Sequence, residues 1–374
     1  MAWQSETDVK STDYTLADSP YTRVLVVLGA GASFDNGRPP PRWNLPLART
    51  LFTQPEFMEA ARSYSEMGGL LEDLRSASEG DGPGIERLLD DLQQDADSIY
   101  PQAKVELMAV RYFLRHVTWV CSDEVVKSTS HGSTTARFLR KLNRWRTSGP
   151  GRSVSVVSFN YDTLLEDAAS SVISREFNSL SDYLDQTRAW QFFKLHGSAN
   201  WAQVIEDGLG GDINPSVRKV IRSAESLKLS ASDFRMWEQP PNVMSSHMPK
   251  FSYATADQVA VAPAIALPLI NKAKFACPPE HVTEFRASGR DFDVLIIVGW
   301  QAKEPHFLKE LQPRRRVPTI VIGGKNAGDV MVALRELQIS GQGIIEPNGF
   351  SHVMSGPDLE KFLSAPSNIW PGGA

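Results

Sequence analysis

The sequence predicts an α/β fold, in which a doubly wound parallel sheet carries an inserted helical module. Short, continuous apolar runs recur along the chain, and such runs are typical of strands covered on both faces. Segments of helical periodicity separate these runs, and this alternation favours parallel strands joined by crossover helices. The length of 374 residues leaves room for a large core and an inserted or flanking module.

The expected strands are short and rich in Val and Ile. The first is Arg23 to Leu28, which ends in glycine, and the second is Val154 to Phe159. Later apolar runs are Phe192-Phe193, Val259 to Val261, Val294 to Val298, Thr319 to Ile322 and Gly343 to Ile345. Because helical segments lie between them, we expect these runs to form one parallel sheet.

Helical spacing dominates residues 45–147, between the first two strands. The apolar positions recur every three or four residues, as in Leu107, Val110, Leu114 and Val117. A last helix, about Ser133 to Trp145, precedes the second strand, with Ser133 or Thr134 as its N-cap. The polar stretch 206–250, rich in Ser, Pro and Gly, is expected to have little sheet character.

Composition and charge exclude several classes of protein. With 41% hydrophobic and 22% charged residues and a net charge of -5, the chain is an ordinary globular protein without a nucleic-acid-binding excess of basic residues. Cys121 and Cys277 are the only cysteines and are far apart, so neither a disulfide framework nor a metal site is expected. A signal core and a membrane-spanning apolar run are both missing, which predicts a cytoplasmic protein without membrane contact.

The turn after the first strand contains Gly29, Ala30, Gly31 and Ser33. Glycines at such a turn let the backbone approach a pyrophosphate group beside a helix N-terminus. The turn departs from the dehydrogenase fingerprint, because Phe34 stands at the third glycine position and helices follow instead of a second strand. Taken alone, it is explained equally well as a tight turn that binds nothing.

Two polar segments follow other expected strands. Ser158, Asn160 and Asp162 lie at the end of the second strand, and the segment from Leu195 through His196 to Ser198 follows the third apolar run. Since the carboxyl ends of parallel strands meet at the edge where open α/β sheets bind ligands, we expect these side chains to share one crevice.

Together the three segments resemble the sirtuin-like domain family of bacterial anti-phage defence NAD hydrolases. Members carry an Asn-Tyr-Asp-Thr segment and a Leu-His-Gly-Ser segment in this order after the glycine turn, and the resemblance extends roughly from Val24 to Leu363. It implies a Rossmann-like domain over residues 21–363, between a polar tail at 1–20 and a C-terminal tail at 364–374. It also implies that NAD is the substrate and that no metal is needed.

The resemblance implies roles for individual residues. His196 would act as the base and Asn160 would hold water or the ribose, with Asp162 and Ser158 in support. Imidazole suits a base near neutral pH, and the amide can both donate and accept. A structural histidine and a helix-capping asparagine are the ordinary alternatives.

Further contacts to NAD follow from the same resemblance, and they are Gly37, Gly299, Trp300, Gly323 and Asn326. A plain turn between strand and helix explains the last two equally well. His131 repeats a His-Gly-Ser tripeptide without a preceding strand and is expected at the surface. His306 is expected to begin a helix, and it is the alternative base if His196 is not the one.

The chain departs from protein-deacylating sirtuins because it cannot form their four-cysteine zinc ribbon. Hydrolysis of NAD is therefore favoured over lysine deacylation. A non-catalytic NAD or ADP-ribose sensor and an ADP-ribosyl transferase stay open as alternatives.

Regulation is expected to come from assembly, because no second sensor domain is apparent after Leu363. Either a homo-oligomer or a partner in trans would supply it, and the resemblance implies a DNA-translocating ATPase or an Argonaute-type protein. Phe113, Trp119 and Trp145 of the helical module would form the contact surface, or would fill the module's own core.

Overall fold

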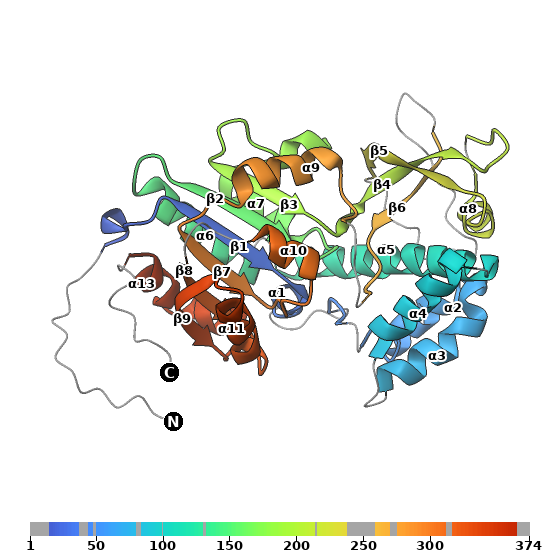
Figure 1. The fold of residues 1–374 in the computed structure, drawn as a ribbon, viewed down its shortest axis with the longest axis horizontal. Helices are drawn as coiled ribbons and strands as arrows, with labels where there is room; N and C mark the ends of the chain where they lie inside the picture. Colours follow the sequence, from blue (N-terminus) through green and yellow to red (C-terminus); the bar gives the residue numbers. More distant parts are fainter. Residues whose placement is uncertain are drawn as a thin grey trace.

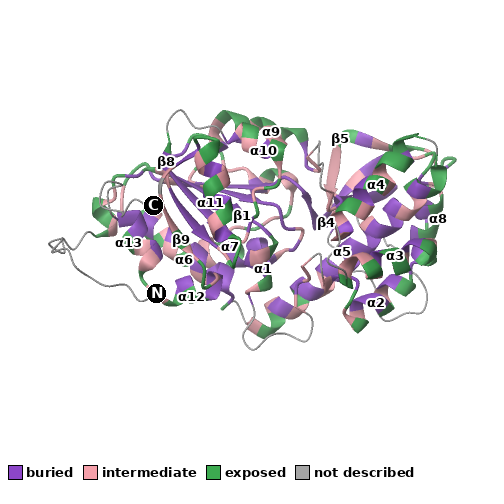
Figure 2. Cartoon of the chain, turned by 60° about the horizontal axis from the view of Figure 1, so that its bottom comes forward, coloured by how far each residue is buried: buried purple, intermediate pink, exposed green. Residues whose placement is uncertain are grey.

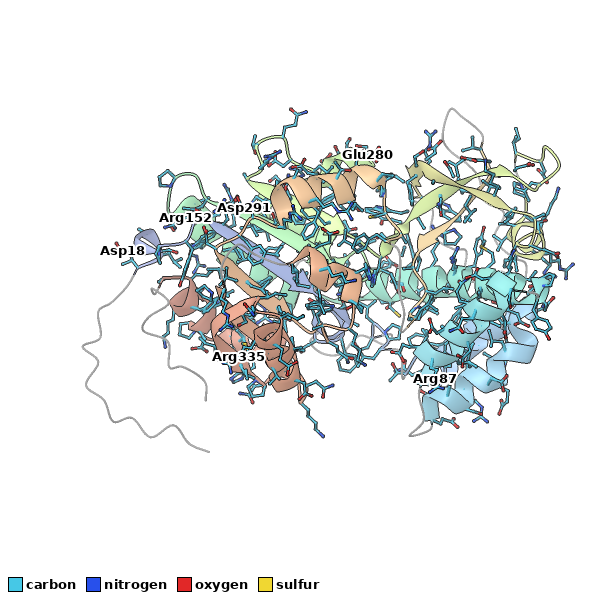
Figure 3. The ribbon with its side chains drawn as sticks, viewed as in Figure 1. Asp18, Arg87, Arg152, Glu280, Asp291 and Arg335 are labelled. Atoms are coloured by element: carbon cyan, nitrogen blue, oxygen red, sulfur yellow. The ribbon has the colours of Figure 1, made fainter. Side chains whose placement is uncertain are left out.

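The computed structural model shows two lobes side by side, a parallel sheet covered by helices and a second, mainly helical lobe (Figure 1). The residues it describes are 15–36, 44–47, 50–79, 84–98, 100–129, 132–213, 215–237, 259–269, 275–311 and 316–364. Charged side chains such as Arg87, Glu280 and Asp291 lie on the outside (Figure 3). Among the described helices, none has both the length and the apolar character needed to cross a membrane.

A six-stranded parallel sheet forms the first lobe, and its order is β3-β2-β1-β7-β8-β9. The strands are β1 (Arg23–Leu28), β2 (Ser153–Ser158), β3 (Trp190–Lys194), β7 (Val294–Val298), β8 (Val317–Ile322) and β9 (Ser340–Glu346). Strand β1 pairs with β2 on one side and β7 on the other, so the order reverses between β1 and β7. The predicted doubly wound, Rossmann-like sheet is confirmed, with its switch point at the carboxyl ends of β1 and β7.

Helices cover both faces of this sheet (Figure 1). On one face lie α6 (Thr134–Thr147), α7 (Leu164–Ile173), α12 (Phe350–Ser355) and α13 (Asp358–Ser364), and α6 contacts the other three. On the other lie α9 (Pro279–Glu284), α10 (Pro305–Glu310) and α11 (Ala327–Glu336). The expected cap of α6 is confirmed, because the Ser133 hydroxyl accepts a hydrogen bond from the Ala136 amide at 3.1 Å. Two covered faces explain why β7 and all but the first residue of β1, at the centre of the sheet, are continuously apolar.

The second lobe combines helices with a small antiparallel sheet and has its own buried core (Figure 2). Its helices are α2 (Pro55–Arg62), α3 (Gly68–Glu79), α4 (Gly84–Ser98), α5 (Pro101–Thr129) and α8 (Val217–Arg222). Its strands are β4 (Gly197–Asp207), β5 (Lys228–Met236) and β6 (Val261–Ile265), in the order β5-β4-β6. The remaining elements, found in both lobes of the described chain, are short. They are α1 (Ala30–Phe34), the 3-10 helices Leu16–Asp18, Ser65–Met67 and Leu180–Tyr183, and the π-helix Phe285–Gly289.

The antiparallel sheet corrects two expectations. The apolar run at 259–261 leads into β6, which belongs to this sheet and not to the parallel one. The expectation of little sheet character in 206–250 was wrong for its described part, because β5 pairs with β4 over several residues. Residues 214 and 238–250 of that stretch lie outside the described residues. Strand β5 is mostly half-buried, with Leu229 packed against one core and Phe234 and Met236 against the other. These apolar residues are widely spaced in a polar segment, so the sequence shows no continuous hydrophobic pattern there.

Helix α6 lies within the range expected for the inserted module, yet its apolar residues pack in the core of the parallel sheet. Within residues 45–147, the helices that pack in the core of the second lobe end at α5, which is 29 residues long. Helix α5 links the lobes, because Ser122 Oγ accepts from the Thr163 amide, just before α7, at 3.3 Å. Within its own lobe it is joined to β6 by the Tyr112 hydroxyl, which donates to the Val261 carbonyl at 3.2 Å.

Candidate functional site

The turns after β1 and β7 pack backbone against backbone at the switch point. The Gly29 amide donates to the Val298 carbonyl at 2.9 Å, and the Gly31 amide donates to the Gly299 carbonyl at 3.1 Å. A Cβ on Gly29 would lie 2.6 Å from the Gly299 oxygen, and one on Gly299, at φ +60, would lie 2.3 Å from the Ala32 amide nitrogen. These glycines are required by the fold itself, before any ligand is considered.

Asn160 joins the turn after β2 to the turn after β1. Its Nδ2 donates to the Gly29 carbonyl at 2.9 Å and to Ser33 Oγ at 2.7 Å. Ser33 Oγ in turn donates to Asp162 Oδ2 at 2.5 Å. The backbone amide of Asn160 donates to Ser158 Oγ at 3.1 Å. The structure therefore brings five sequence-predicted residues into one hydrogen-bonded group, which are Gly29, Ser33, Ser158, Asn160 and Asp162.

One acceptor of this group, Asn160 Oδ1, has no hydrogen bond within the described residues. Asn160 is 8% exposed, and its Oδ1 is buried with no hydrogen-bond partner among the residues that the structure describes. Both of its amide protons are used by Gly29 and Ser33, so the orientation of the side chain is determined by its partners. A buried acceptor in this state is suited to a hydroxyl group or water brought by a ligand.

Asp162 supports this arrangement from the start of α7. Its Oδ1 accepts from the Leu164 amide at 3.1 Å, while Oδ2 accepts from Ser33. Burial raises the pKa of the Asp162 carboxyl, and the nearby charge of Lys194 and the hydrogen bond from Ser33 act in the opposite direction. Asp162 thus holds Ser33 and the first turn of α7 in place.

His196 occupies the turn between β3 and β4. The residue is only 1% exposed, and its ring lies 4.6 Å from the Phe159 ring, between centroids. The Leu195 amide donates to the Ser158 carbonyl at 3.2 Å, which places the histidine turn beside the end of β2. Gly197 follows at φ +79, where a Cβ would lie 1.8 Å from the Ala264 carbonyl oxygen, so no other residue fits after the histidine.

The chain matches no protein-family model and no curated protein. Among solved structures it is similar to a mutant Sir2 homologue in complex with ADP-ribose, at 11% identity over 93% of this chain and 94% of that chain, with a TM-score of 0.42. A Sir2 homologue mutant with 2′-O-acetyl ADP-ribose shows 13% identity over 96% and 95% of the two chains, also with a TM-score of 0.42.

A third similar structure is a Sir2 complex with a deacetylated p53 peptide and 3′-O-acetyl ADP-ribose, at 11% identity over 93% of this chain and 96% of that one, with a TM-score of 0.38. The three TM-scores lie below 0.5. The fold assignment therefore rests on the strand order and parallel pairing of the chain itself.

Trp300, expected as a contact to NAD, belongs to an aromatic group beneath the site. It is 5% exposed, stacks on Phe159 at 5.6 Å between centroids, and donates from Nε1 to Glu304 Oε2 at 2.6 Å. Its ring and that of His196 pack on the same phenylalanine. Trp300 thus supports the histidine turn through Phe159.

The other expected contacts are not joined to Asn160. Gly323 follows β8 and donates its amide to the Glu346 carbonyl at 3.0 Å, and Asn326 is at the N-cap position of α11. His306 is the second residue of α10, as expected, with its ring 4.6 Å from that of Phe275. Gly37 and His131 lie outside the described residues.

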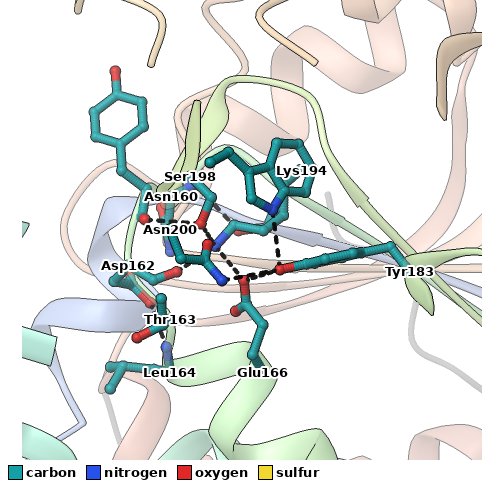
Figure 4. Close-up of polar contacts among 12 residues, drawn as sticks. Asn160, Asp162, Thr163, Leu164, Glu166, Tyr183, Lys194, Ser198 and Asn200 are labelled. Atoms are coloured by element: carbon teal, nitrogen blue, oxygen red, sulfur yellow. Dashed lines mark hydrogen bonds and ion pairs between the residues drawn. The ribbon is translucent and has the colours of Figure 1, made fainter. Parts of the chain in front are cut away.

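Sequence reasoning missed a buried polar network directly behind Asp162 (Figure 4). Its members are Lys194, Glu166, Tyr183, Ser198, Asn200 and Trp201. The available signal was a lysine that ends an otherwise apolar strand, directly before Leu195 and His196. Over the described part of the chain, no group of three or more His, Cys, Asp or Glu side chains is arranged to hold a metal ion.

Proposed function

We propose that this protein cleaves the bond between nicotinamide and ribose in NAD with water, releasing nicotinamide and ADP-ribose. The observation that carries the proposal is the open, buried Oδ1 of Asn160 at the switch-point edge of the sheet, next to the turn that holds His196. Ligands of open α/β sheets bind at this edge.

The chemistry suits these two side chains. In the reaction the C1′–N bond breaks, nicotinamide leaves with the bonding electron pair, and water adds to the oxocarbenium-like ribose. His196 takes the proton from that water, and imidazole is a base of the appropriate strength near neutral pH. Asn160 Oδ1 accepts a hydrogen bond from the ribose hydroxyl or the water, and its fixed orientation keeps this acceptor in place before the substrate arrives.

The expected contacts to the rest of NAD stay predictions. The hydrogen bonds that these residues already make limit which of their groups can contact NAD. The pyrophosphate would lie against the backbone of the turn formed by Gly29, Ala30, Gly31 and Ser33. The Gly29 and Gly31 amides already donate to the Val298 and Gly299 carbonyls, so these two glycines would allow close approach of the backbone rather than supply hydrogen-bond donors. Gly299 and Trp300 would act mainly through the shape that they impose on the neighbouring turn. The site would be extended on either side by Gly37, Gly323 and Asn326. Ser158 would act indirectly, by accepting a hydrogen bond from the backbone amide of Asn160.

The test is incubation with NAD in the presence of a chelator, with nicotinamide and ADP-ribose measured by mass spectrometry. We expect turnover without metal, and we expect His196→Ala and Asn160→Ala each to lower it about a hundredfold to ten-thousandfold, as for loss of one group in acid-base catalysis. His352→Ala, at an exposed position, and Asn143→Ala, at a half-buried position outside the site, are matched controls and should behave like the parent protein.

The same assay separates the alternatives. Loss of turnover on chelation would contradict the metal-free proposal, and an active His196→Ala variant would move the base elsewhere, with His306 the next candidate. Binding of NAD without products would identify a sensor, whereas ADP-ribose attached to an added hydroxyl, amine or acyl-lysine acceptor would identify a transferase or deacylase.

The resemblance to defence proteins also underlies a proposed role for the reaction. Depletion of NAD would act in anti-phage defence, under control of a homo-oligomer or of a partner such as a DNA-translocating ATPase or an Argonaute-type protein. Phe113 and Trp145 cannot form the contact surface as expected, because both are fully buried in the chain's own cores. Of the three aromatic residues, Trp119 alone keeps some exposure.

A further inference from the structure

Lys194 is a fully buried lysine, with 0% of its side chain exposed. Its Nζ donates to the Asp162 carbonyl, to Glu166 Oε1 at 2.9 Å and to Ser198 Oγ at 2.6 Å (Figure 4). All three protons of the ammonium group are therefore used, and the three acceptors belong to different segments.

These contacts join the two turns that carry the candidate site. Asp162 belongs to the turn after β2, while Ser198 belongs to the start of β4, just after His196. Two further hydrogen bonds cross the same gap, because Ser198 Oγ donates to the Tyr161 carbonyl at 3.3 Å and the Ala199 amide donates to it at 2.7 Å. Lys194 thus holds the turn of Asn160 against the turn of His196.

Glu166 balances the buried charge from the first turn of α7. Its Oε1 also accepts from the Tyr183 hydroxyl at 2.7 Å, and that hydroxyl accepts from Trp201 Nε1 at 3.2 Å. Buried ion pairs are costly to desolvate, and apolar residues of similar volume often stabilise a core as well or better. Stability by itself therefore does not account for a lysine and a glutamate at this place.

The charged groups facing Asp162 are Lys194 from β3 and Glu166 from α7, and its polar neighbours are Ser33 from α1 and the Leu164 amide. Asn160 reaches the carboxylate through Ser33. Burial raises the pKa of Asp162 most, the charge of Lys194 is the strongest opposing influence, and Glu166 adds a smaller upward effect. If the charges of Lys194 and Glu166 were both removed, the pKa of Asp162 would rise further, because the larger of the two opposing effects, that of Lys194, would be lost.

We propose that Lys194 is a positioning residue, which fixes the Asn160 and His196 turns relative to each other. Its charge also opposes protonation of Asp162, the acceptor for Ser33. This inference rests on the proposed cleavage of NAD. Lys194 acts through its neighbours and does not touch the substrate.

Lys194→Met alone leaves Glu166 as an unpaired buried charge and is expected to fold poorly. The informative variant is the double substitution Lys194→Met with Glu166→Gln, which removes both charges and keeps an acceptor for Tyr183. We expect it to fold, with kcat for nicotinamide release lowered about tenfold to a hundredfold while KM for NAD changes less. The acid limb of its pH-rate profile should move upward by about one pH unit, the lower end of the effect of a neighbouring charge.

The chain offers a matched control pair. Lys141 Nζ also donates to a glutamate, Glu360, at 2.6 Å, and to a main-chain carbonyl, that of Gly356, at 2.9 Å, but it joins α6 to α13. Lys141→Met with Glu360→Gln should alter stability without moving kcat or the pH profile. A folded Lys194/Glu166 double variant with the kcat and pH profile of the parent protein would overturn the proposal.

A second measurement separates this inference from the proposed function. If the parent protein releases no nicotinamide under any condition, the proposed function fails, and the ¹³C-carboxyl NMR titration of Asp162, assigned with Asp162→Asn, still tests Lys194. A higher titration midpoint in the double variant supports the charge effect, and an unchanged midpoint overturns it.

Discussion

The two halves of the candidate site are built by different means. The turns after β1 and β7 are held by backbone contacts that leave no space for a Cβ at Gly29 or Gly299. The turns after β2 and β3 are held by buried polar side chains, of which Asn160, Asp162 and Lys194 make the main links. Ser33 joins the halves, because it accepts from Asn160 and donates to Asp162.

This difference predicts different weaknesses. A half made of close backbone contacts should tolerate changes of pH but not the addition of a methyl group, since protein interiors cannot absorb such overlaps. A half made of buried ionisable groups should tolerate small changes of volume better than changes of protonation.

The largest effect is expected in the backbone half, from Gly299→Ala. The added Cβ would meet the Ala32 nitrogen at 2.3 Å, and the φ of +60 is unfavourable for alanine. We expect a loss of about 3 kcal/mol or more in the free energy of unfolding, measured by chemical denaturation. Gly324→Ala is the control, because a Cβ there meets nothing within 4 Å. Equal stability of the two variants would disprove the backbone argument.

An intermediate effect is expected in the polar half, through His281. Its ring packs on Tyr183 and Trp201, and Nε2 lies 3.1 Å from the Leu180 carbonyl. Burial lowers the pKa of His281 to about 4, from 6.5. The unfolded chain therefore takes up the proton first as the pH falls, so the stabilisation is complete above pH 6.5 and is lost toward pH 4.

The expected loss over that pH range is on the order of 2–3 kcal/mol in the free energy of unfolding. His281→Gln should remove this part of the pH dependence, whereas exposed His352→Gln should leave it as in the parent protein. Denaturation curves at pH 7 and pH 4 measure the difference. Parallel pH dependence in His281→Gln and the parent protein would show that His281 contributes nothing.

The smallest effect is expected at the link between the halves, from Ser33→Ala. This change leaves Asp162 Oδ2 and Asn160 Nδ2 each with one hydrogen-bond partner fewer, at a cost of about 1–2 kcal/mol in the free energy of unfolding. Ser171→Ala, which loses only a bond to its own helix carbonyl at Ala168, should cost less than about 0.5 kcal/mol. If Ser33→Ala and Ser171→Ala are equally stable, the two halves are not coupled through Ser33.

Sequence reasoning succeeded where burial leaves a local pattern. Apolar runs such as Val294 to Val298 revealed strands of the parallel sheet, because a strand covered on both faces has no polar position. It failed for β5, a mostly half-buried strand whose few apolar residues are widely spaced and which pairs with β4. It also failed for the packing of α6, because a helical pattern does not say which core the helix faces.

For the candidate site, the sequence by itself determined the kinds of residue at the strand ends. Ser33, Asn160, Asp162 and His196 were selected there, and the structure places the first three in one hydrogen-bonded group. These residues can be found in sequence because parallel strands bring their carboxyl ends to one edge, wherever the strands lie along the chain.

The tertiary structure alone decided how these residues are held. Lys194 and Glu166 meet only because α7 and β3 pack together, and Gly299 is required only because its turn presses on α1. Contacts between distant segments leave no periodicity in the sequence, and the cost of burying a charge or a Cβ depends on the atoms that surround it. The packing of the turns after β2 and β3, rather than the motifs alone, therefore leaves Asn160 Oδ1 as the acceptor available to a ligand.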